Sequence, residues 1–181
     1  QTHRFRDAME EYAHACELLP ESHEALSGFL RSQERVDDSK FAIEKLLSLS
    51  RKRPSQHELF FPLALHYRKL NEVKSALRFV DRTIQTGSAH ADAYACAIRW
   101  RMEMGNTIDA ERILADAESK NLRAFELHKC GLQLSLKKGD INSAFSHLDL
   151  MTQTTDADLT PLKRRITALA AKLNARTVAE V

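Results

Sequence analysis

Metal binding and nucleophilic catalysis need histidine, cysteine or acidic side chains at fixed spacings, and this sequence offers eight histidines and three cysteines. No two histidines lie four residues apart, the spacing that places two ligands on one helical face, and none sits beside a cysteine at ligand spacing. The chain also has no nucleophile elbow, phosphate-cradling glycine loop or metalloprotease helix motif. We therefore expect no catalytic residue, no metal site and no bound cofactor.

Acidic residues recur at one position of the sequence pattern, at Glu24, Glu58, Asp92 and Glu126. Each stands near the expected start of a helix, where a negative charge interacts favourably with the helix dipole. We interpret this row as helix-starting residues and not as a row of metal ligands.

The three cysteines, Cys16, Cys96 and Cys130, cannot all pair with one another and match no zinc-binding pattern. We interpret them as buried, reduced thiols. Reduced thiols favour a cytoplasmic setting, although the parent chain can carry a targeting signal outside this segment, so the localisation stays open. No apolar run reaches the roughly 20 residues of a membrane span.

An alanine recurs every 34 residues, at Ala8, Ala42, Ala76, Ala110 and Ala144. A fixed period of this length is typical of arrays of helical repeats. Alanine suits a position where two helices cross closely, because a larger side chain would push the backbones apart. We expect the larger side chains four residues further on to fill the space between repeats. These are Tyr12, Leu46, Val80, Leu114 and Leu148.

Turn and capping residues mark the expected helix ends. Asp37, Asn71, Gly105 and Gly139 form a column of residue types that accept turn conformations. We expect Asp37 or Asp38 to cap the helix that follows, and Asn71 to cap the next second helix. Glycine tolerates the left-handed conformation, so Gly105 and Gly139 are expected to stop helices.

Three features have competing interpretations. Pro62 lies inside an expected helix, and we favour a helix that begins late, near Phe60, or kinks, over a distortion that opens a groove beside Phe61. Trp100 is flanked by two arginines, yet we favour a half-buried tryptophan packed on the adjacent helix over a binding anchor. The run 51–53 (Arg-Lys-Arg) ends a helix, where we expect solvated cations that favour the dipole.

The repeat pattern resembles the tetratricopeptide repeat (TPR) family, whose period is also 34 residues. The resemblance covers roughly residues 4–152. It rests on the five alanines, on Tyr12, Leu46 and Leu114, on Ala15 and Ala117, and on Pro20 and Pro54 at repeat ends. The segments Asn-Glu-Val-Lys-Ser-Ala and Gly-Asp-Ile-Asn-Ser-Ala look like its turn and second helix. The sequence departs from the family where Ser88, Leu122 and Asp156 replace the terminal proline and where Thr83 replaces alanine.

The resemblance implies an all-α fold, a right-handed superhelical solenoid of antiparallel helix pairs with a C-terminal capping helix at about 160–175. That helix can equally open a further repeat. We expect one domain over residues 1–181, cut from a longer protein. Its repeat units are about 1–20, 21–54, 55–88, 89–122 and 123–156.

The resemblance also implies a non-catalytic scaffold that binds a partner peptide or helix along a concave groove lined by the first helix of each pair. By that analogy the groove combines apolar and basic side chains, as a binding surface requires. The groove residues are Ser27, Arg31, Phe61, Leu65, Arg68, Arg99, Met102, Lys129 and Gln133.

Two alternatives stay open. Related helical repeats bind RNA, but 27 basic against 25 acidic residues give a net charge of only +2, which disfavours a polyanion partner. The array can also be the docking domain of a larger enzyme or of a secretion or assembly protein. Self-association is open as well, because solenoid ends and grooves offer unpaired apolar surface.

Overall fold

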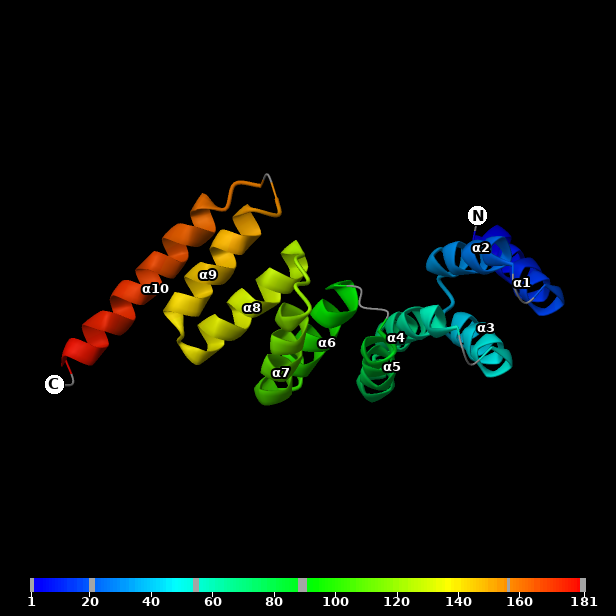
Figure 1. Ribbon diagram of the computed structural model, residues 1–181, viewed down its shortest axis with the longest axis horizontal. Coiled ribbons are helices and arrows are strands. Elements are labelled where there is room, and N and C mark those ends of the chain that lie inside the picture. The colour runs from blue at the N-terminus through cyan, green and yellow to red at the C-terminus, as the bar shows by residue number, and fades with distance from the viewer. Residues whose placement is uncertain (1, 20–21, 54–55, 88–90, 156, 180–181) are drawn as a thin grey trace. The chain divides into compact units, whose positions relative to one another are not determined.

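The computed structural model describes residues 2–19, 22–53, 56–87, 91–155 and 157–179, and within these ranges it describes the side chains of residues 4 to 171 (Figure 1). Within these ranges the chain forms ten α-helices and one short 3-10 helix, with no strand, which confirms the all-α class. None of the helices described is both long and apolar enough to cross a membrane. The helices group into two compact units, Gln1–Ala89 and His90–Val181. The single domain over 1–181 therefore stays a prediction.

The described residues of the first unit form five α-helices. Its most extensive helix contacts join α1 with α2, α3 with α4, and α4 with α5, so α2 and α3 of the expected 21–54 repeat pack mainly on their other neighbours. The elements are α1 (Thr2–Leu18), α2 (His23–Glu34), α3 (Ser39–Lys52), a 3-10 helix (His57–Leu59), α4 (Phe60–Lys69) and α5 (Val73–Gln85).

The second unit pairs its helices in the expected repeat order. Helix α6 packs on α7 and on α8, α8 packs on α9, and α10 lies along α9 (Figure 1). A core around Ala144, Leu148 and Ile166 holds the last three helices together. The elements are α6 (Ala91–Glu103), α7 (Thr107–Ser119), α8 (Phe125–Lys138), α9 (Ile141–Thr152) and α10 (Thr160–Ala179).

The alanine column is fully buried at four of its five positions. Ala42, Ala76, Ala110 and Ala144 have no solvent exposure, as close helix packing requires. Ala8 on α1 is only half-buried. The packing role of the column is thus confirmed for four of its five members.

The turn column behaves as expected at three positions, because Asn71, Gly105 and Gly139 all have positive φ angles, of 61°, 78° and 76°. Asp38 caps α3, with its carboxylate accepting a hydrogen bond from the Phe41 backbone N–H at 3.1 Å. The expected capping role of Asn71 is wrong. It ends α4 in the left-handed region that asparagine tolerates, and its side chain caps no helix start.

Pro62 sits in the first turn of α4, which begins at Phe60 after the 3-10 helix. There its missing N–H removes no helical hydrogen bond. The late helix start is therefore confirmed. The repeat-end positions Pro20, Pro54, Ser88 and Asp156 lie outside the described residues.

The basic run at the end of α3 is only partly solvated. Arg51 and Lys52 are exposed, but Arg53 is only 8% exposed. Its guanidinium donates hydrogen bonds to the carbonyl oxygens of Cys16 and, at 3.2 Å, Leu19. The expectation of three solvated cations is wrong for Arg53, because it caps the carbonyls at the C-terminal end of α1.

Candidate functional site

The apolar part of the expected groove lies on α4. Phe61 is half-buried and Leu65 is 36% exposed, so both present apolar surface to solvent. Arg68, one turn after Leu65, donates a hydrogen bond to the side chain of Asn71 at 3.2 Å. Pro62 in the first turn favours the start of α4 at Phe60, and this start sets the position of these side chains along the helix.

On α2 the two expected groove residues are exposed, and they contact each other. The Arg31 Nε donates to the Ser27 carbonyl at 3.4 Å. Arg31 also lines an open cavity of about 460 Å³ with Tyr12 and Gly28, formed between α1 and α2. The Tyr12 ring packs directly over Gly28, where a Cβ would lie 2.3 Å from the nearest ring atom. Arg31 is thus oriented partly toward α1.

The other four groove residues lie on α6 and α8, which pack against each other. Arg99 on α6 contacts the Cys96 sulfur at 3.4 Å and remains exposed. Lys129 on α8 pairs with Glu126 at 3.1 Å. The Met102 carbonyl accepts a hydrogen bond from Lys137 at 3.3 Å, which ties the two helices together. Gln133, also on α8, is exposed.

Each unit therefore contains part of the predicted groove. The residues on α2 and α4 belong to the first unit, and those on α6 and α8 to the second. One continuous wall from Phe61 to Met102 stays a prediction.

The cysteines under the α6–α8 surface are poor nucleophiles. Burial raises the pKa of Cys96, and it raises the pKa of Cys130 to about 11. Burial also raises the pKa of Cys16. All three are free and buried, which confirms the interpretation as reduced core thiols. Since the thiolate is the reactive form, none of them is activated for attack at neutral pH.

Trp100 is only 3% exposed, so it packs in the core instead of anchoring a partner. The interpretation as a packed tryptophan is confirmed, and its burial exceeds the half-burial expected. Among the residues whose placement is described, no three His, Cys, Asp or Glu side chains are arranged to hold a metal ion.

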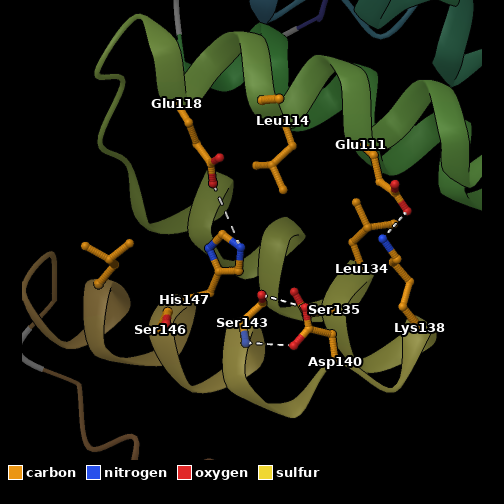
Figure 2. Close-up of a pocket in the computed structure, with 12 residues that line it drawn as sticks. Glu111, Leu114, Glu118, Leu134, Ser135, Lys138, Asp140, Ser143, Ser146 and His147 are labelled. Atoms are coloured by element: carbon orange, nitrogen blue, oxygen red, sulfur yellow. Dashed lines mark hydrogen bonds and ion pairs between the residues drawn. The ribbon is translucent and has the colours of Figure 1, made fainter.

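Sequence reasoning missed a polar cavity of about 350 Å³ between α7, α8 and α9 (Figure 2). Its charged side chains pair across the opening, with Lys138 bonded to Glu111 at 3.0 Å. Asp140 caps α9, accepting hydrogen bonds from the backbone N–H and the hydroxyl of Ser143. Lys138, Asp140 and Ser143 lie 27 to 32 positions after Glu111, so no local sequence motif predicts the cavity.

His147 forms one wall of this cavity, facing Glu118 across 3.9 Å (Figure 2). Burial lowers the pKa of His147, and burial with the neighbouring His147 lowers the pKa of His128. The two rings lie 6.2 Å apart. At neutral pH both imidazoles are uncharged, and the edge of the His147 ring packs on Gly131, whose missing Cβ makes room for it. This arrangement fastens α8 to α9.

A buried histidine network in the first unit was also missed. His66 on α4 is 1% exposed, with Nε2 bonded to the Gln33 side-chain oxygen at 2.7 Å and Nδ1 to the Ser39 hydroxyl at 3.2 Å. Burial, assisted by the positive charge of Lys69, lowers the pKa of His66 to about 4. The network ties α2, α3 and α4 together in a neutral form. The sequence around His66 does not predict this network, because its partners Gln33 and Ser39 lie 33 and 27 residues away.

Neither a protein-family model nor a curated protein sequence matches the chain. Solved structures do. The chain is similar to MamA (TM-score 0.67, 18% identity, 82% of this chain and 87% of that chain). It is also similar to TTC0263, a thermophilic TPR protein of Thermus thermophilus (TM-score 0.60, 18% identity, 93% and 92%). A third similar structure is the APC/C hetero-tetramer Cut9-Hcn1 (TM-score 0.62, 14% identity), where the match covers 96% of this chain and 34% of that one.

These similarities lie below 25% identity, so they bear on architecture alone. They agree with the 34-residue alanine column, with its buried members and with the antiparallel helix pairs. The chain has a tetratricopeptide-type repeat fold.

Proposed function

We propose that the chain is a non-catalytic protein-interaction scaffold. A partner peptide or helix lies along the exposed face of the first helix of each repeat (α2, α4, α6 and α8). The observation that carries the proposal is the surface of α4, where Phe61 and Leu65 offer apolar area beside the guanidinium of Arg68. A water-exposed leucine next to an arginine is the composition of an interface core with a polar rim. Protein binding is typical of this repeat architecture.

The charges indicate the chemistry of the partner. In the first unit the cations on this face are Arg31 and Arg68, and in the second they are Arg99 and Lys129, of which Lys129 is already paired with Glu126. The nine predicted groove positions include four basic residues and no acidic one. We therefore expect a peptide with apolar side chains flanked by acidic ones, because complementary charge speeds association and rejects basic competitors.

A peptide-display selection tests the proposal without knowledge of the natural partner. Random twelve-residue peptides are selected on the wild-type chain, and the enriched peptides are measured by fluorescence polarisation. The double variant Leu65→Ser/Arg68→Gln should weaken their binding by about tenfold or more, since truncating one central anchor already has this effect. Circular dichroism should show unchanged helicity and melting, because Leu65 is exposed and Arg68 is half-buried in the last turn of α4.

The matched control is Ile108→Ser/Arg112→Gln on α7. Ile108 is 80% exposed, and Arg112 follows it one turn later, so this variant also removes an exposed apolar side chain and a cation, but from a second helix. The control should bind the peptides like the wild type. Equal affinities for the Leu65/Arg68 variant and the wild type would refute the assignment. A generic single-stranded RNA that bound at low salt, with affinity falling steeply as salt rises, would favour RNA binding instead.

A further inference from the structure

A second cavity, of about 390 Å³, lies in the first unit between α3, α4 and α5. Three arginines line it together with three aromatic rings. The arginines are Arg51 in the last turn of α3 and Arg78 and Arg82 on α5, and the rings are Phe60, Tyr67 and Phe79. Two serines and Leu47 complete the lining, so no carboxylate is among the lining residues.

The aromatic rings form a fixed base for the cations. The Tyr67 and Phe79 rings are stacked, with centroids 5.4 Å apart and an angle of 7° between their planes. The guanidinium of Arg82 lies 4.1 Å from the centre of the Phe60 ring. The guanidinium of Arg78 lies 5.8 Å from the centre of the Phe79 ring. Cation–π contacts engage the flat faces of these groups and leave the N–H edges available for an anion.

The three arginines bring three positive charges to one cavity. Arg78 and Arg82 are four residues apart on one helix, where like charges destabilise the helix. Among the described residues none of the three guanidinium groups is within ion-pair distance of a carboxylate. The carboxylate of Glu72 accepts a hydrogen bond from the lining Ser75 at 3.2 Å and does not itself line the cavity.

We propose that this cavity binds a phosphomonoester dianion, held by Arg51, Arg78 and Arg82, with the organic group of the ester against the aromatic rings. A phosphomonoester carries a charge of about −1.5 to −2 at neutral pH and three acceptor oxygens, which matches several forked donors better than a single carboxylate does. The site lies on a different face of α4 from Phe61, Leu65 and Arg68. Phe60 and Tyr67 are seven residues apart and share one stripe of the helix, and Phe61 and Arg68, each one residue later, share the next stripe. It is therefore independent of the proposed peptide groove.

The test is isothermal titration of the whole chain with phenyl phosphate. Inorganic phosphate, which lacks the ring, and phenylacetate, which has the ring but one negative charge, should each bind several-fold more weakly. Arg82→Gln and Arg51→Gln should each reduce the affinity for phenyl phosphate by about tenfold, the effect of losing one charge-assisted hydrogen bond. In the absence of anion, Arg78→Gln should raise the melting temperature slightly, because it removes repulsion with Arg82.

The matched control is Arg35→Gln. Arg35 is an exposed arginine whose guanidinium lies 5.7 Å from the Phe5 ring, so the variant also removes one positive charge and one cation–π contact, but outside the cavity. It should leave the affinity unchanged. Equal loss in Arg35→Gln and Arg82→Gln, or no loss in Arg82→Gln, would overturn the proposal.

A short peptide with one phosphoserine and no other charged side chain tests which kind of molecule supplies the phosphoryl group. Binding tighter than phenyl phosphate, and sensitive to Arg82→Gln, supports the site and assigns it to a phosphorylated side chain. Weaker binding with the same sensitivity supports the site and assigns it to a small phosphorylated compound. Peptide and phenyl phosphate binding that are both insensitive to Arg82→Gln would remove the site altogether.

Discussion

His66 makes the stability of the first unit depend on pH. It is 1% exposed and bonds through both ring nitrogens to Gln33 and Ser39, and its pKa falls to about 4. In the unfolded chain a histidine titrates near 6.5. The unfolded chain therefore takes up a proton, on acidification, that the folded chain does not accept. The stability associated with His66 is complete above pH 6.5 and is lost as the pH falls toward 4.

The size of the loss follows from these two values. The difference between 6.5 and about 4, at 1.36 kcal/mol for each pH unit, corresponds to about 3.4 kcal/mol when the process is complete. At pH 5 the unfolded histidine is almost fully protonated and the folded one almost fully neutral, so about 2 kcal/mol is already lost relative to pH 7.5. A change of this size is a large fraction of the stability of a small unit.

The assay is urea unfolding followed by circular dichroism at pH 7.5 and pH 5 for the wild type and His66→Gln. From pH 7.5 to pH 5 the free energy of unfolding should fall by about 2 kcal/mol more in the wild type than in the variant. The control His23→Gln removes an exposed histidine on α2 and should keep the wild-type dependence. NMR titration of the His66 ring gives the pKa directly. A pKa near 6.5, or equal losses in wild type and His66→Gln, would refute the reasoning.

Three further substitutions test the packing. Gly131→Ala should lower the free energy of unfolding by about 1–3 kcal/mol, because its Cβ would lie 2.4 Å from a ring atom of the buried His147. The same cost in a His147→Ala background would contradict the clash. Gly28→Ala should be neutral or stabilising by up to about 1 kcal/mol, since Tyr12 is 37% exposed and its ring can move into solvent; a clear loss in urea unfolding would disprove this. Arg53→Met should cost about 3 kcal/mol, about 1.5 for each charge-assisted bond to α1, and a thermal melt unchanged from wild type would rule out the capping role.

The architecture could be predicted because the repeat encodes it redundantly. Ala42 and its equivalents each specify a close helix crossing, so an error at one position leaves the period intact. Local capping was less certain. Asp38 caps a helix as predicted, but asparagine suits both a cap and a left-handed turn, and only the path of the chain decides that Asn71 ends α4. The exposure of Ala8 depends on which helices surround α1, which periodicity does not specify.

The proposed groove positions are assigned from the repeat phase, and two of them, Leu65 and Arg99, are exposed to solvent. The clusters missed by sequence reasoning join distant segments. Arg53 bonds to carbonyls 34 and 37 residues away, and His66 to side chains 27 and 33 residues away. The arginine cavity likewise combines three helices. Such contacts depend on how the helices pack, and a local sequence pattern does not predict them.

Chemical-shift mapping with a selected peptide tests the scaffold proposal most directly. The 15N-labelled chain is titrated with the tightest peptide from the display selection, and the backbone amide shifts are followed residue by residue. We predict that the largest changes fall on the first helices, around Phe61, Leu65 and Arg68 on α4. Largest changes on the second helices α3, α5 or α7, with α4 unaffected, would contradict the proposed binding face.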